Sequence, residues 1–231
     1  MRKNKSSSSR SNSIKYLAAV AAAAFAWAFI FLVPPEFMGI KNYLKLSPVE
    51  RNYLAGLKSK YSGAQRELSP EQAKSVIKNA LKFMDEAKDS PASFNTPEAL
   101  ALLFGTACAE TLLKPRYQDF GGDAIGLFQI DYFTFKDLWE RFIPNTRPAL
   151  YSKMREKYSR FPNGEIYFED LQLSDELCAV FARMKYAMNQ EPLPPADNIE
   201  AQALYYKKHY NTRLGKATPQ SYIDRLQGRS P

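Results

Sequence analysis

The chain has 231 residues, of which 45% are hydrophobic, 24% charged and 13% aromatic, a composition that excludes a disordered protein and a coiled coil. Its formal charge of +8 comes from 32 Lys and Arg against 24 Asp and Glu, and five of the basic residues lie in residues 1–15, which hold no acid. The remainder carries only +3, so the sequence does not indicate a nucleic-acid-binding protein.

A charge-free segment follows this basic, serine-rich arm. Residues 16–33 contain 18 residues without a charge and end at Pro34-Pro35. This length suffices to span a bilayer, and the positive flank predicts that the arm is cytoplasmic and that the rest of the chain lies on the periplasmic or outer face. The alternative is a cleaved signal peptide that releases a secreted or virion-associated protein, because residues 24–26 and 26–28 form small-x-small cleavage sites. We favour the anchor, since cleavage would leave an apolar new N-terminus.

Residues 34–68 predict a juxtamembrane connector, and residues 69–231 predict a mainly helical domain. Most of the expected helices begin after a Ser, Thr or Asp that can cap them, often with Pro at the first helical position. The expected helices cover residues 70–88, 97–113, 133–142, 148–158 and 174–188, one that opens with a capping box of Asp197 and Glu200, and one that opens with Thr218-Pro219. With one short β-like turn, the fold class is α+β and mainly α.

The two cysteines, Cys108 and Cys178, do not have the paired spacing of a zinc or redox site. We therefore expect no metal and no cofactor. Both cysteines lie in apolar helical segments, which predicts buried thiols, although an exported compartment would also permit a disulfide.

Glu110 is the only charged residue between Ala99 and Leu113 in the second of these helices. A helix that is apolar all round is the central helix of its domain, so a lone carboxylate near its end faces a partner or a cleft. Burial and the negative end of the helix dipole would both raise the pKa of Glu110, which suits a general acid. The alternative is a structural role, either in an ion pair with Lys114 or Arg116 or with the side chain pointing to water.

A glycine-rich segment, residues 121–131, follows this helix. Its three glycines predict tight turns or a close approach of main chain to a ligand. We expect a small β-like turn that lines a groove, with Gln129 as a neutral hydrogen-bonding side chain; the alternative is an ordinary structural loop. The phosphate-loop pattern is absent.

Three motifs in order, Glu110-Thr111, residues 126–130 (Gly-Leu-Phe-Gln-Ile) and Tyr210-Asn211, resemble the lysozyme-like lytic transglycosylases. This group includes the soluble lytic transglycosylases and goose-type lysozymes, and the residues around Tyr210-Asn211 look most like phage and prophage members. The family pattern is Glu-Ser, Gly-Leu-Met-Gln-Ile and Tyr-Asn, and the resemblance covers residues 69–226.

The resemblance implies a lysozyme-like domain that cleaves the β-1,4 bond between N-acetylmuramic acid and N-acetylglucosamine in peptidoglycan, with a 1,6-anhydro product. Glu110 would be the acid and base, and Tyr210 would hydrogen-bond or orient it. The implied substrate-binding residues are Thr111, Gly126, Leu127, Phe128, Gln129, Ile130, Tyr210 and Asn211.

Some residues depart from the family pattern. Thr111 replaces a serine and keeps the hydroxyl, while Phe128 replaces a methionine and would keep the apolar bulk of the groove wall. Thr212-Arg213 follows the Tyr-Asn pair where Ala-Gly is common, so the loop beyond it differs.

Other functions stay open at this point. A hydrolytic lysozyme would need a second carboxylate, for which Asp119, Asp123 and Asp131 are available. The first two flank glycines and can shape turns, and Asp131 can cap the helix that follows. A non-catalytic glycan-binding membrane protein, or an enzyme acting on another polymer such as chitosan, would keep the same groove. His209 has no Ser or Cys nucleophile in a triad-like context, so we interpret it as a surface or packing residue.

Overall fold

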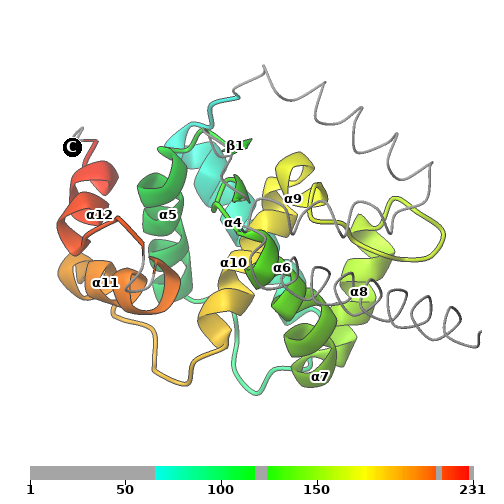
Figure 1. Ribbon diagram of the computed structural model, residues 1–231. Helices are drawn as coiled ribbons and strands as arrows, with labels where there is room; N and C mark the ends of the chain where they lie inside the picture. The colour runs from blue at the N-terminus through cyan, green and yellow to red at the C-terminus, as the bar shows by residue number, and fades with distance from the viewer. Residues whose placement is uncertain (1–65, 118–123, 212–214, 229–231) are drawn as a thin grey trace, which may run out of the picture. The chain divides into compact units, whose positions relative to one another are not determined.

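Helices make up most of the described chain, with two short strands between α5 and α6 (Figure 1). The computed structural model describes residues 66–117, 124–211 and 215–228, all within the compact unit Leu54–Pro231. The elements are α4 (Pro70–Asp85), α5 (Pro97–Thr111), β1 (Arg116–Tyr117), β2 (Ile125–Gly126), α6 (Tyr132–Asp137), the π-helix η2 (Leu138–Phe142), α7 (Ile143–Thr146), α8 (Pro148–Tyr158), α9 (Asp170–Leu173), α10 (Asp175–Ala187), α11 (Ile199–Tyr206), the π-helix η3 (Lys207–Asn211) and α12 (Pro219–Leu226). The prediction of a mainly helical body with little strand is confirmed.

Side-chain caps open the long helices where the sequence predicted them. Ser69 accepts a hydrogen bond from the Gln72 backbone N–H, and the Gln72 side chain accepts one from the Ser69 N–H, which completes a capping box before α4. Thr96 caps α5 and Thr218 caps α12, each with proline at the first helical position. These caps satisfy N–H groups that have no partner within the helix.

The predicted start of α11 is wrong by one residue. Asn198, and not Asp197, accepts a hydrogen bond from the backbone N–H of Ala201, and the helix begins at Ile199. Asn and Asp cap helices equally well, so two such residues in succession leave the position of the cap undetermined.

Helix α5 is the central helix of the described unit and packs against α4, α10, α11 and α12 (Figure 1). Its buried positions lie all around its circumference, as the apolar sequence predicted. Gly105 in its middle permits the closest approach, because a Cβ there would lie 1.8 Å from the hydroxyl of the fully buried Tyr222 on α12. The absent side chain explains why a residue that weakens helices stands in this one.

The two strands follow α5 in the sequence and form one antiparallel pair. Arg116 pairs with Gly126 and Tyr117 with Ile125. Strand β2 then turns back on itself, and Ile125 pairs with Ile130. The β-like turn predicted in the glycine-rich segment is therefore present, and we call residues 125–130 the hairpin.

Both cysteines are buried free thiols. Burial raises the pKa of Cys108 to about 11 and that of Cys178 to about 12. A thiol with so high a pKa is a poor nucleophile near neutral pH, so both behave as small core side chains.

Several predictions concern residues outside the described ranges. These are the basic arm (1–15), the apolar segment (16–33), most of the connector (34–68) and the loop carboxylates Asp119 and Asp123. Within the described ranges, none of the helices has the length and apolar character that crossing a bilayer requires.

Candidate active site

Glu110 lies in the last turn of α5, where the chain leaves the central helix. Its carboxyl is partly exposed, and its Oε1 accepts a hydrogen bond of 2.7 Å from the hydroxyl of Tyr206. The helix ends directly afterwards because Leu112 and Leu113 adopt left-handed φ angles of 52° and 61°. The end of α5 therefore places the Glu110 carboxyl at the edge of the core, where the Tyr206 hydroxyl holds one of the carboxyl oxygens.

Tyr206, at the end of α11, is the tyrosine that orients Glu110. Burial raises the pKa of Tyr206, and the negative charge of Glu110 raises it further, so the phenol keeps its proton and remains a donor. We predicted this role for Tyr210, but the hydroxyl of Tyr210 donates to the backbone carbonyl of Phe128 at 2.8 Å. A phenol has one proton, so this bond assigns Tyr210 to the hairpin.

The hairpin is a tight, internally bonded turn. Ile125 and Ile130 exchange backbone hydrogen bonds of 3.0 and 3.1 Å. Gly126 and Gln129 have positive φ angles of 80° and 46°, and the Gln129 side-chain amide donates to the Gly126 carbonyl at 3.0 Å. Gln129 is partly buried, and the bond of its side chain to Gly126 closes the hairpin on itself.

The apolar side chains of the hairpin do not line a groove. Leu127, Phe128 and Ile130 are each 0% exposed and belong to the hydrophobic core. We expected Phe128 to form part of the groove wall. That expectation is wrong for the side chain, because α5, α9 and α10 enclose the hairpin.

Thr111 fixes the hairpin to α5. Its buried hydroxyl lies 2.9 Å from the carbonyl oxygen of Leu127 and 3.0 Å from that of Ala107, and its single proton is shared between these two acceptors. The side chain is therefore a buried brace between α5 and the hairpin, next to Glu110 in sequence.

Helix α9 holds the hairpin from the other side. The backbone N–H of Gly126 donates to Oε1 of Gln172 at 3.1 Å. A Cβ at Gly126 would lie 2.8 Å from both the Cys178 sulfur and the Leu171 carbonyl oxygen. Only glycine combines this φ angle with so close an approach.

Asn211 supports the end of η3. Its Oδ1 accepts a hydrogen bond of 2.9 Å from Nζ of Lys207, which also donates to the carbonyl of Gly215 at 2.8 Å. The amide that we predicted to bind substrate therefore shares the ammonium of Lys207 with the carbonyl of Gly215.

Asp131 is a helix cap. Its Oδ1 accepts from the Thr134 backbone N–H at 2.8 Å, and its Oδ2 accepts from the Thr134 hydroxyl at 2.6 Å. Of the three proposed second carboxylates it is the one within the described chain, and both of its oxygens have structural partners.

Two basic side chains complete the surroundings of Glu110. Arg225 of α12 donates to the carbonyl of Ala109 at the end of α5. Lys185 of α10 lies with Nζ 4.1 Å from the centre of the Tyr210 ring. Burial lowers the pKa of Lys185, whereas the charges of Asp131 and Glu110 raise it.

The different partners of the Tyr206 and Tyr210 hydroxyls can be tested with a matched pair of phenylalanine variants. We expect Tyr206→Phe to lower activity by about 10-fold with little change in stability, because it releases one oxygen of Glu110. We expect Tyr210→Phe to lower the free energy of unfolding by about 1–3 kcal/mol, because it leaves the buried Phe128 carbonyl without a donor. Urea denaturation and initial rates on peptidoglycan distinguish the two, and a stability loss confined to Tyr206→Phe would contradict the assignment.

Asp170, the first residue of α9, makes the support of the hairpin sensitive to pH. It is 2% exposed, and burial raises its pKa to about 6 from 3.8, although the Tyr167 N–H and Arg160 oppose this. The folded chain then holds a proton that the unfolded chain has lost, so stability falls as pH rises from about 4 to 7, by about 3 kcal/mol.

Asp170→Asn removes this dependence. We expect the variant to gain stability relative to the wild type as the pH of a urea denaturation series is raised over this interval. A difference in stability that stays constant with pH would contradict the assignment.

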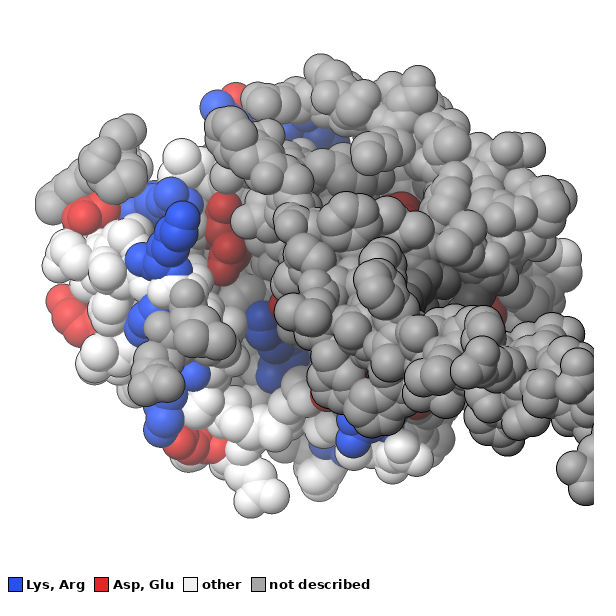
Figure 2. All heavy atoms as spheres, viewed as in Figure 1, with Lys and Arg blue, Asp and Glu red and all other residues white. Residues whose placement is uncertain are grey.

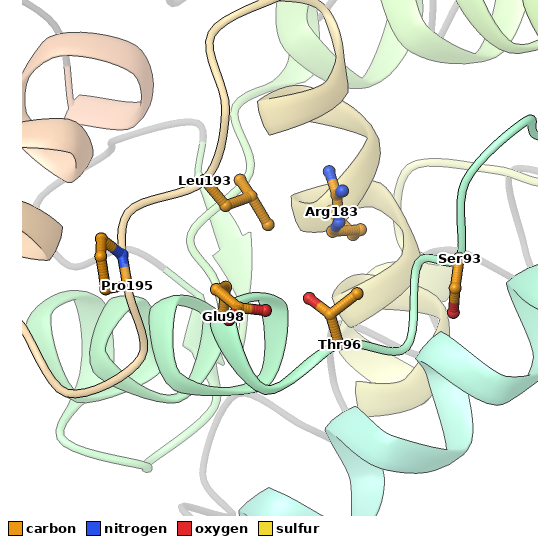
Figure 3. Close-up of a pocket in the computed structure, with 6 residues that line it drawn as sticks. All are labelled: Ser93, Thr96, Glu98, Arg183, Leu193 and Pro195. Carbon is orange, nitrogen blue, oxygen red and sulfur yellow. The ribbon is translucent and has the colours of Figure 1, made fainter.

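A separate pocket lies at the opposite end of α5 from Glu110 (Figure 3). Its volume is about 390 Å³, and Arg183 of α10 faces the first turn of α5 across it. None of the predicted site residues lines it; its residues are Ser93, Thr96, Glu98, Arg183, Leu193 and Pro195.

Three residues of the site did not emerge from the sequence: Tyr206, Lys185 and Gln172. Tyr206 lies four residues before Tyr210 and so on the same helical face, which was the available signal. Lys185 gave no comparable signal, because α10 also carries Asp175, Glu176 and Arg183. Gln172 gave no signal in the sequence, because its hydrogen-bond partner is the backbone N–H of Gly126, 46 residues away.

Searches of protein-family models, curated proteins and solved structures find no match to this chain.

Proposed function

We propose that the protein is a peptidoglycan lytic transglycosylase with a lysozyme-like domain and Glu110 as its acid and base. The observation that carries the proposal is the position of this carboxyl. It lies partly exposed at the end of an apolar helix, one oxygen is held at 2.7 Å by a buried phenol, and the hairpin that resembles the family motif is bonded to the next residue, Thr111.

The chemistry requires one carboxyl group. Glu110 in its acid form gives its proton to the bridging oxygen as the bond from that oxygen to the anomeric carbon breaks. The resulting carboxylate then takes the proton of the C6 hydroxyl of the same sugar, whose oxygen bonds to the anomeric carbon and closes the 1,6-anhydro ring. Tyr206 keeps the carboxyl in one orientation through both steps.

The hydrogen bonds of Asp131 favour this route over hydrolysis. A lysozyme needs a second carboxylate to activate water or to attack the sugar. Asp131 has both oxygens bonded to Thr134, so using it would uncap α6. A muramidase remains the second candidate through Asp119 or Asp123, which lie outside the described chain.

The proposed setting is the cell wall. Residues 16–33 would anchor the chain in the membrane, and glycan strands of peptidoglycan would be its partner. On the described part of the face in Figure 2, Lys and Arg side chains lie beside Asp and Glu side chains.

Mass spectrometry of the fragments released from purified peptidoglycan tests the proposal. The full-length chain should release fragments that are lighter by one water than ordinary reducing-end fragments. Reducing-end fragments would indicate a lysozyme. Binding to peptidoglycan without release would indicate a non-catalytic glycan-binding protein, and release from chitosan alone would indicate another polymer as substrate.

A further inference from the structure

The pocket at the opposite end of α5 from Glu110 is lined by two side chains of opposite charge that are not paired with each other. Arg183 comes from α10, and Glu98 comes from the first turn of α5 (Figure 3). No hydrogen bond or ion pair joins either side chain to another residue of the described chain, and the Nε of Arg183 is buried without an acceptor. The polar groups of this guanidinium therefore remain available to a ligand that supplies oxygen acceptors.

An aromatic ring holds the Arg183 guanidinium in place. Its Cζ lies 5.2 Å from the centre of the Phe94 ring, and Phe94 is 3% exposed. The backbone N–H of Phe94 donates to a carboxylate oxygen of Asp85, the last residue of α4. A guanidinium that rests on a fixed ring loses little freedom when it binds a carboxylate, so the receptor is formed before the ligand arrives.

The charges around the pocket balance one another. Arg147 is the second guanidinium near the Phe94 ring, with its Cζ 5.9 Å from the ring centre. The acids are Asp85 and Glu98, and Asp85 is already bonded to hydroxyl and N–H groups of the loop that follows α4. Glu98 is then the carboxylate left to meet a ligand. A ligand with one charge would match either Arg183 or Glu98 and oppose the other, whereas a zwitterion matches both.

The size and the walls of the pocket suit a small molecule. Its volume of about 390 Å³ lies within the range of small-molecule sites. Leu193 and Pro195, from the chain between α10 and α11, form an apolar side of the pocket. The Thr96 hydroxyl oxygen accepts the Ala99 N–H as a helix cap, and its own proton remains to donate. An amino acid with an apolar side chain would use each of these groups.

We propose that this pocket binds a free α-amino acid, with its carboxylate on Arg183, its ammonium on Glu98 and an apolar side chain against Leu193 and Pro195. A planar guanidinium binds a carboxylate through two parallel hydrogen bonds. An ammonium has three donors and no acceptor, so a carboxylate is the partner that it requires. The site goes beyond the proposed function and does not depend on it, because none of its residues takes part in the chemistry proposed at Glu110.

Calorimetric titration of the full-length protein with L-leucine tests the site. Leucine should bind saturably at one site. Leucinamide lacks the carboxylate, 4-methylpentanoate lacks the ammonium, and each should bind at least about 10-fold more weakly, as expected for loss of a bond between charged groups. Leucylglycylglycine, which carries the two charges at opposite ends of a peptide, should also bind more weakly. No saturable binding of leucine up to about 10 mM, or equal binding of any of these three analogues, would overturn the proposal.

Variants assign the two charges to their residues. Arg183→Met should weaken leucine binding by at least about 10-fold and leave the weak binding of leucinamide unchanged. Glu98→Gln should weaken leucine binding similarly and leave that of 4-methylpentanoate unchanged. It alters a partly exposed side chain, so the test remains available if Arg183→Met does not fold. Lys78→Met, at an exposed position on α4, is the control and should bind leucine like the wild type.

Unchanged leucine binding in Arg183→Met or in Glu98→Gln would overturn the site. The titrations contain no glycan, and the assays of fragment release contain no amino acid. The amino-acid site and the proposed function can therefore fail independently of each other.

Discussion

Glu110→Gln should reduce the release of fragments from peptidoglycan by about 10³-fold, within the range for loss of a general acid and base. Glutamine keeps the size of the side chain, and its amide oxygen can still accept the Tyr206 hydroxyl. The variant should therefore fold like the wild type, and the loss should come from the missing proton alone. Clearing of a peptidoglycan suspension measures the effect.

Glu98→Gln provides the matched control. Glu98 lies in the first turn of the same helix, at the opposite end from Glu110. We expect this variant to retain the wild-type rate. Retained activity in Glu110→Gln, or an equal loss in both variants, would show that Glu110 is not the acid.

Gly126→Ala should cost about 3 kcal/mol of stability, because the added methyl group meets both an unfavourable backbone conformation and close neighbours. The φ angle of 80° is unfavourable for alanine by about 1–2 kcal/mol. The new Cβ would also lie 2.8 Å from the Leu171 carbonyl oxygen and from the Cys178 sulfur, and overpacking of this kind costs about 1–3 kcal/mol. Thermal or urea unfolding of the purified variant measures the sum.

Gly228→Ala separates the two contributions. Gly228 has a similar φ of 71°, but nothing lies within 4 Å of the position of a Cβ there, so only the cost of the backbone conformation remains. A loss at Gly126 no greater than that at Gly228 would show that the contact with α9 and α10 is not tight. Because Gly126 adjoins the Thr111 brace, we expect Gly126→Ala to lower activity as well.

The features that the sequence predicted correctly are those set by neighbouring residues. Thr96 and Thr218 cap helices because their side chains reach N–H groups three residues ahead. The central position of α5 followed from its composition alone, since a helix whose only charge after its first turn is Glu110 has no face that favours water.

Long-range packing explains what the sequence could not predict. Tyr206 and Tyr210 lie one helical turn apart, and only the position of α11 and η3 against α5 decides which hydroxyl reaches Glu110. The alternation of glycine and apolar residues indicated a turn near the site. Whether Phe128 faces a groove or the core depends on α9 and α10, which come more than 40 residues later.

Cleavage in water labelled with oxygen-18 tests the central claim, that the sugar's own hydroxyl and not water attacks the anomeric carbon. The account predicts that the fragments released by the full-length chain carry no heavy oxygen, because the 1,6-anhydro ring closes with oxygen already in the substrate. One heavy oxygen at each new reducing end would contradict it, and would show that a second carboxylate directs a water molecule.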